Sequence, residues 1–264
     1  MQVENFGTTW LDFDFSFPCD IHFSFIKPIR NDRFKVLLLA CEPEPIRVSE
    51  AELATQWSSF DLIISHDKRH LQYPNVQLMT FWDTYVNDIP SIKEFEVSSM
   101  ISIGGGPVDM TGYQLRDHLY QRRSEFTIPN RFFISNRLPH WAKFGLPILP
   151  NDKKDAMFSS MFHIAIENHV EPDYFSEKLL DCFNSLTVPI YRGCLNTQEH
   201  GLDERAFLRF ETIDECVAIC NNLTVDDYNQ RVSFLAANRQ LRQSKGLWLE
   251  HVQRIIVTAW AQRS

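Results

Sequence analysis

One short segment of the chain gathers several polar side chains at a predicted strand–loop–helix junction. The segment ENHVEPDYFSEKLLDCFNSLTVPIYRG covers residues 167–193 and contains Asn168, Tyr174, Glu177 and Lys178. Parallel sheets bind ligands beyond the carboxyl ends of their strands, and a helix N-terminus attracts anions because its first N–H groups lack partners. Lys178 falls in the first helical turn, where the helix dipole disfavours a cation, and an anion sharing the site would account for it. The pattern indicates a site for a phosphate-bearing ligand.

The other polar residues of the segment suit the sugar part of such a ligand. A carboxylate at Glu177 can accept hydrogen bonds from sugar or ribose hydroxyls, and the amide of Asn168 can both donate and accept. A structural interpretation is also open, with Glu177 and Lys178 as an exposed helix start and Asn168 as a loop cap. The spacing alone does not choose between the two.

Apolar runs that indicate buried parallel strands alternate with helical patterns along the chain. This alternation predicts an α/β fold with two units, residues 1–88 and 89–264, the second ending in helices able to pack back on the first. Ser49 is expected to cap a short helix, and Gly246 to separate two C-terminal helices. The predicted strands cover residues 34–40, 61–67, 76–82, 95–103, 131–135, 161–168, 187–193 and 206–210.

Composition narrows the class of protein. The formal net charge of -8 argues against a general nucleic-acid binder, and no stretch approaches the roughly 20 apolar residues that span a bilayer. The six cysteines lie mostly in apolar stretches and are expected to be free thiols in a reducing cytosol. Asp12 and Asp14 form the D-x-D pattern of the chain, which we interpret as structural. We therefore predict no metal site and no integral membrane segment.

The segment 167–193 resembles the signature of the α1,3-fucosyltransferases, glycosyltransferase family ten. That signature reads approximately F-E-N, a gap, Y-(I/V)-T-E-K-(I/L), an apolar helix, and (T/V)-(I/V)-P-(I/V)-(Y/V)-x-G. The chain departs from it at Ile166, where the family usually has Phe, at Ser176 in place of Thr, and at Arg192. The similarity extends upstream through DKKDAMFSSMFHIAIEN, which resembles a Lys-containing lead-in, and covers residues 153–223.

The resemblance implies a GT-B architecture, in which two Rossmann-like domains face a cleft. The C-terminal domain would hold the nucleotide sugar, and the N-terminal domain the acceptor and a glutamate base. The stretch ACEPEP is similar to the family segment that carries the base, which implies Glu42, with Glu44 as the alternative. The stretch GYQLRDHLY resembles a family helix whose arginine contacts the diphosphate, which implies Arg116. A solvated loop carboxylate and a surface arginine remain the structural alternatives.

The activity implied is inverting transfer of fucose from GDP-fucose to a hydroxyl of an oligosaccharide or glycolipid, in an α1,3 linkage, with no obligatory cofactor. The rival hypotheses are a transferase that uses another GDP-sugar and an inactive sugar-nucleotide-binding protein. A chain without membrane anchor or stem would suit a soluble cytoplasmic enzyme of bacterial or viral origin. The implied catalytic residues are Glu42 and Glu177, and the implied donor-binding residues are Arg116, Asn168, Tyr174, Glu177 and Lys178.

Overall fold

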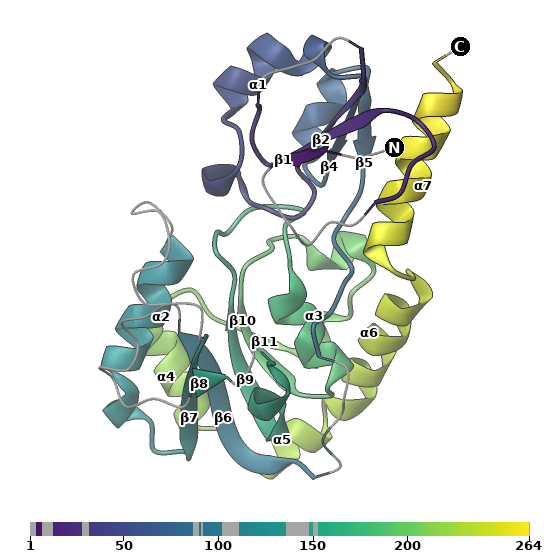
Figure 1. Cartoon of the computed structure of the whole chain (residues 1–264). Coiled ribbons are helices and arrows are strands. Elements are labelled where there is room, and N and C mark those ends of the chain that lie inside the picture. Colours follow the sequence, from purple (N-terminus) through teal and green to yellow (C-terminus); the bar gives the residue numbers. More distant parts are fainter. Residues whose placement is uncertain are drawn as a thin grey trace. The chain divides into compact units, whose positions relative to one another are not determined.

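The chain forms two compact units in a computed structural model that describes residues 4–6, 13–27, 32–86, 90, 92–101, 111–135, 148–149 and 153–263 (Figure 1). The first unit comprises residues 1–82, 171–174 and 245–264, and the second comprises residues 83–170 and 175–244. The contacts divide the chain between Trp82 and Asp83, whereas the sequence prediction puts the boundary at 88 and 89. Each unit has its own parallel sheet.

The sheet of the first unit has the order β1-β2-β3-β4-β5, and every described pair in it is parallel. Sequence analysis predicted the last three strands but not the first two. Ser49 caps helix α1 (Glu50–Gln56) as predicted, because its side chain accepts a hydrogen bond from the Glu52 N–H at 3.2 Å. The strands are β1 (Glu4–Phe6), β2 (Cys19–Phe23), β3 (Phe34–Leu38), β4 (Leu62–Ser65) and β5 (Val76–Leu78).

Two apolar groups hold the first unit together. One lies where α1 packs on β3 and β4, and consists of Leu37, Leu39, Val48, Leu53, Phe60 and Ile63. The other is aromatic and involves helix α7 (Trp248–Ala261), whose Trp260 stacks on Phe17 at 4.4 Å and meets Phe34 edge-on at 5.5 Å. Many of the N-terminal phenylalanines thus fill core space, as their number suggested.

The sheet of the second unit has the order β11-β10-β9-β6-β7-β8, again parallel throughout the described pairs. Its strands are β6 (Glu94–Ile101), β7 (Asn130–Ser135), β8 (Ile148–Leu149), β9 (Ser160–Ile166), β10 (Val188–Arg192) and β11 (Leu208–Arg209). Its helices are α2 (Thr111–Gln121), α3 (Glu177–Asn184), α4 (Ile213–Asn221), α5 (Val225–Asn229) and α6 (Val232–Ser244).

Short 3-10 helices fill several of the connections. In the first unit they are η1 (Glu44–Ile46), η2 (Trp57–Ser59) and η3 (Lys68–Gln72), and in the second η4 (Arg123–Glu125), η7 (Asp155–Ser159), η8 (Thr197–His200) and η9 (Glu204–Ala206). Gly246 separates α6 from α7 as predicted, at a φ of 70° that a residue with a side chain rarely adopts.

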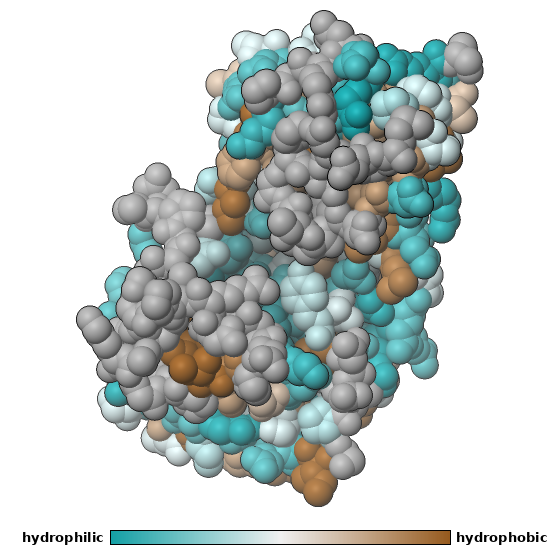
Figure 2. All heavy atoms as spheres, in the orientation of Figure 1, coloured by the Kyte–Doolittle hydropathy of each residue, from teal (hydrophilic) through white to brown (hydrophobic). Residues whose placement is uncertain are grey.

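No helix in the described part of the chain is both long and apolar enough to cross a membrane. The exposed large apolar side chains include Ile92, Leu71 and Leu195, which are distant in sequence. On the face shown in Figure 2, hydrophobic residues form separate spots among hydrophilic ones.

Leu53 provides a test of the α1 packing. Replacing this fully buried side chain with Ala should lower the free energy of unfolding by about 2–5 kcal/mol, because it leaves a cavity between α1 and the sheet. Urea unfolding of the Leu53→Ala protein measures the change, and Ala54→Ser, on the exposed side of the same helix, is the control. Equal stability of the two variants would contradict the packing described.

Candidate functional site

The start of α3 is fixed by a buried carboxylate at the end of β9. Ser176 is the N-cap of α3, and its hydroxyl accepts a hydrogen bond from the Lys178 N–H at 3.3 Å. Glu167, the residue after β9, in turn accepts from the Ser176 N–H at 2.9 Å and from the Ser176 hydroxyl at 2.6 Å. The strand end therefore holds the helix start directly, and the positions of Glu177 and Lys178 follow from it.

Glu167 is completely buried, and burial raises the pKa of its carboxyl above the usual range, while Lys178 lowers it. The Lys178 ammonium lies 3.7 Å from this carboxylate. Gly193 makes room for it, since a Cβ at that position would lie 2.4 Å from the Glu167 Cγ and 2.4 Å from the Tyr191 hydroxyl. The final Gly of the sequence motif thus has a packing reason.

Glu177 lies between two lysine side chains. Its Oε1 is 2.8 Å from the Lys154 ammonium and 3.4 Å from that of Lys178. Burial works against ionisation, but the two ammonium groups outweigh it and hold the pKa of Glu177 well below its usual range. Glu177 is therefore an ionised carboxylate that is largely shielded from solvent. Both lysines remain close to one oxygen of it.

Lys154 was not among the predicted site residues. It precedes η7 and brings a second cation to Glu177, which the spacing within the 167–193 segment could not reveal. Its ammonium is also 3.5 Å from Asp181 and 5.0 Å from the centre of the Tyr85 ring. The resemblance to a Lys-containing lead-in was the signal available in the sequence.

Arg116 and Asn168 meet in the second unit. Arg116 projects from α2 and donates to the Ile166 carbonyl at 2.5 Å and to the Asn168 side-chain oxygen at 3.1 Å. Its guanidinium also lies 4.5 Å from the centre of the Tyr113 ring. Arg116 is buried, so the alternative of a surface arginine is wrong. In this state it organises the carboxyl end of β9.

A small cavity connects these groups. It is lined by Arg116, Lys154, His163, Lys178 and Asp181 together with apolar residues of β6, η7 and β9. Its volume of about 20 Å³ suits a water molecule and not a diphosphate. Burial and the nearby lysines lower the pKa of His163 to about 3, so its imidazole is neutral. The charged groups at the cavity are thus three cations and the Asp181 carboxyl, and the rest of its wall is mostly apolar.

The first unit holds the other two predicted site residues. Glu42 lies in the turn after β3, and Tyr174 is buried with its ring centre 5.5 Å from that of His66. One hydrogen bond and one ion pair hold the 171–174 segment within this unit. His66 lies 3.1 Å from Glu171, and Lys68 lies 3.1 Å from Asp173. The described contacts therefore do not place Tyr174 in the same unit as Glu177 and Lys178.

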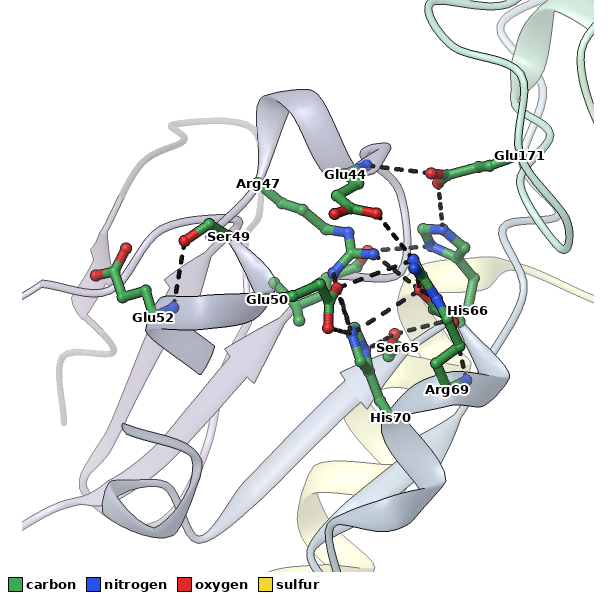
Figure 3. Close-up of polar contacts among 12 residues, drawn as sticks. Glu44, Arg47, Ser49, Glu50, Glu52, Ser65, His66, Arg69, His70 and Glu171 are labelled. Carbon is green, nitrogen blue, oxygen red and sulfur yellow. Dashed lines mark hydrogen bonds and ion pairs between the residues drawn. The ribbon is translucent and has the colours of Figure 1, made fainter. Parts of the chain in front are cut away.

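The carboxyl end of β4 carries a dense group of charged residues (Figure 3). Glu50, Asp67 and His70 bring potential metal-ligating atoms within 4.8 Å of one another. The fully buried guanidinium of Arg47 lies among them, at 3.1 Å from Glu50, 3.0 Å from Asp67 and 3.2 Å from His70. A fixed cation already occupies the place that a metal ion would take, so these residues do not fit a metal site.

Glu44, the alternative base, belongs to the same group. Arg69 donates a hydrogen bond to the Glu44 carboxylate at 3.0 Å, and the backbone N–H of Glu44 donates to Glu171 at 3.4 Å. Hydrogen bonds from Arg69 also overcome the effect of burial and lower the pKa of Asp67 to about 2. Glu44 is therefore paired with an arginine. The choice of Glu42 as the base rests on the resemblance and stays a prediction.

Comparison with known families finds a match in the C-terminal half of the chain. The sequence model described as glycosyltransferase family 10 (fucosyltransferase), C-terminal, matches residues 142–253. This part of the chain is thus similar to the C-terminal domain of the family 10 glycosyltransferases. The resemblance stated from the sequence is thereby confirmed, and the protein is an enzyme of the glycosyltransferase class. No curated protein sequence matches the chain.

Solved structures similar to this chain show its fold. An α1,3-fucosyltransferase with GDP-fucose superimposes with a TM-score of 0.51 at 15% identity, covering 83% of this chain and 69% of that one. Anabaena HepE in complex with UDP gives 0.59 at 10% identity, covering 87% of this chain and 72% of HepE. TarM gives 0.57 at 9% identity, with 91% and 54% covered. These are GT-B folds, and the predicted fold class is confirmed.

Gly112 lets α2 approach the end of β9. A Cβ there would lie 1.9 Å from the Glu167 carbonyl oxygen and 2.8 Å from that of Asn168. Gly112→Ala should therefore displace Arg116 and lower the free energy of unfolding by about 1–3 kcal/mol. Thermal unfolding measures it, with Gln121→Ala on the exposed end of α2 as the control. An unchanged melting temperature would show that the approach is looser than described.

Proposed function

We propose that this glycosyltransferase transfers fucose from GDP-fucose to a hydroxyl of an oligosaccharide or glycolipid, inverting the anomeric centre and forming an α1,3 linkage. The observation that carries the proposal is the start of α3, where an ionised Glu177 and the Lys178 ammonium lie side by side at a helix N-terminus. The similarity of residues 142–253 to the family 10 glycosyltransferases supports the assignment of this arrangement to a sugar-nucleotide site.

The diphosphate would leave toward the cations of the second unit. Negative charge grows on the diphosphate as the sugar–oxygen bond breaks, and preorganised donors stabilise such charge most effectively in a dry site. Lys178 is the donor of choice, aided by the first N–H groups of α3, and Arg116 would contribute after exchanging its present bonds. With these cations in the chain, we propose that no metal ion or other cofactor is obligatory.

The sugar ring acquires positive charge in the transition state of glycosyl transfer. Glu177 is suited to stabilise that charge or to accept hydrogen bonds from sugar and ribose hydroxyls, because its two neighbouring lysines keep it ionised. Asn168 and Tyr174 would complete donor binding, the first by hydrogen bonds and the second by packing.

The acceptor hydroxyl must lose a proton as its oxygen attacks the anomeric carbon. A carboxylate within about 3 Å of that hydroxyl would serve as the general base. We assign this role to Glu42, in the turn that follows β3, because parallel sheets present their functional groups at that end. The reaction would take place in the cytoplasm.

The nature of the nucleotide decides between the proposal and its rivals. Calorimetric titration of the purified chain with GDP-fucose, GDP-mannose, GDP and UDP, without divalent metal, should show binding of the GDP ligands and not of UDP. Preferential binding of UDP would contradict the proposed donor. Equal transfer from GDP-mannose would assign another GDP-sugar, and binding of GDP-fucose without turnover on any acceptor would indicate an inactive binding protein.

Lys178→Ala should weaken binding of GDP and GDP-fucose together. The loss of one charge-assisted contact to the diphosphate corresponds to about a 10–100-fold rise in Kd. Calorimetry measures both ligands, and Lys153→Ala, an exposed lysine of the same unit, is the control. Wild-type affinity in Lys178→Ala would remove this residue from the donor site.

Glu42→Gln should leave GDP-fucose binding nearly intact and lower kcat by about 100-fold or more, because the amide cannot accept the hydroxyl proton. Transfer to a glycan acceptor is the measurement, and Glu44→Gln is the matched variant. A larger loss in Glu44→Gln than in Glu42→Gln would transfer the role of base to Glu44, and full turnover in both would exclude the pair.

A further inference from the structure

We propose that Lys154 is a positioning residue for the reaction: bound to Asp181, it holds the Glu177 carboxylate in place and ionised, so that Lys178 can turn to the diphosphate. The inference rests on the proposed function, and it assigns separate tasks to two lysines that contact the same carboxylate. Lys178 would touch the donor, whereas Lys154 would act only through Glu177.

The contacts of Lys154 bridge one face of α3. Its ammonium donates to Glu177 at 2.8 Å and lies 3.5 Å from Asp181. Glu177 and Asp181 are four residues apart, so both carboxylates lie on the same side of the helix. The ammonium of Lys154, whose side chain is only 12% exposed, lies between two carboxylates on one helix face and so fixes its own position and that of Glu177.

Asp181 holds the Lys154 ammonium by its own fixed position in the second unit. One oxygen of its carboxylate accepts backbone N–H bonds from Tyr85 at 2.7 Å and Val86 at 3.2 Å. Its other oxygen is buried and has no hydrogen-bond partner among the described residues, apart from the ion-pair distance to Lys154. An aspartate held this way offers Lys154 a second anchor that is independent of Glu177.

Lys178 is held less firmly than Lys154. Its ammonium lies 3.1 Å from the Ser176 hydroxyl, 3.4 Å from Glu177 and 3.7 Å from Glu167, all longer than the Lys154–Glu177 contact. A diphosphate offers a stronger partner for this ammonium. When Lys178 turns to the diphosphate, the largely covered carboxylate of Glu177 would be left without a cation unless Lys154 stayed in place.

A purely structural role for Lys154 makes a different prediction. A buried ion pair that only stabilised the fold would change the folded fraction of the protein without changing the charge or orientation of Glu177 in the folded molecules. The decisive measurements therefore concern Glu177 itself and the kinetics of the folded fraction.

The first experiment follows the Glu177 carboxyl by carbon-13 NMR over pH in the free protein, so it does not depend on donor or acceptor. The charged groups that face Glu177 are Lys154, Lys178, Glu167 and Asp181. In Lys178→Ala the pKa of the Glu177 carboxyl should still lie well below its usual range. In Lys154→Met the pKa of the same carboxyl should rise by more than it does in Lys178→Ala. A larger rise in Lys178→Ala would overturn the assignment.

The second experiment is a double-variant cycle of transfer from GDP-fucose, with Lys154→Met, Glu177→Gln and the two combined. Lys154→Met should lower kcat about tenfold or more, while the affinity for GDP alone stays near the wild-type value. The combined variant should be no slower than Glu177→Gln, because Lys154 acts through Glu177. Lys154→Arg should recover part of the loss, and Lys153→Met is the control for charge.

The outcomes separate this inference from the proposed function. Additive losses in the cycle, or a loss of GDP affinity in Lys154→Met equal to that in Lys178→Ala, would overturn the positioning role while leaving the transferase intact. A wild-type protein that neither binds nor uses GDP-fucose would instead reject the proposed function, and the NMR titration would still decide which lysine holds Glu177. If Lys154→Met does not fold, Lys154→Met/Asp181→Leu removes one charge of each sign and takes its place in both experiments.

Discussion

The bond between the Glu167 carboxylate and Ser176 is the constraint on which the candidate donor site depends. A buried carboxylate is costly unless it is hydrogen-bonded, and this one is satisfied by the backbone and side chain of the residue that caps α3. The cost of leaving it unsatisfied therefore enforces the geometry of the junction. Glu177 and Lys178 are the next two residues along the chain, so the fixed position of the Ser176 cap also determines their positions. The two glycines at positions 112 and 193 allow the backbone to come close enough for this.

Charge balance then determines what the junction can do. Two lysines and three carboxylates share a buried region around the start of α3, and each lysine contacts more than one carboxylate. The pKa of Asp181 is raised to about 6 by burial and by Glu177, whereas the pKa of Glu177 itself is lowered. The pKa values of two neighbouring carboxyls on one helix face are thus shifted in opposite directions. Such separation lets Glu177 keep a full negative charge beside the two lysines.

The sequence predicted much of the fold because its strongest signals are local. Apolar runs indicated β3, β4 and β9, the Ser49 cap indicated the start of α1, and Gly246 indicated the break before α7. Strand β2 was missed although CDIHF alternates apolar and polar residues, which is the period-2 pattern of a strand, and all five residues are buried. The roles of Lys154 and Glu167 were missed because they depend on contacts between a strand end, a lead-in and a helix. Spacing along one segment could point to Glu177 and Lys178 but could not reveal what holds them.

The path of the chain limits how such a protein can be divided. The chain leaves the first unit at Trp82, returns to it for residues 171–174, leaves again, and comes back for α7. Neither unit is therefore a continuous stretch of the gene. Consider a chimera in which residues 1–82 of this chain replace the corresponding part of a relative. It would contain Phe17 and Phe34 but not the Trp260 that packs on them. It would also contain His66 and Lys68 without their partners Glu171 and Asp173. Exchange of one unit between two such proteins thus requires matched changes at three places in the sequence, which favours divergence by substitution over recombination.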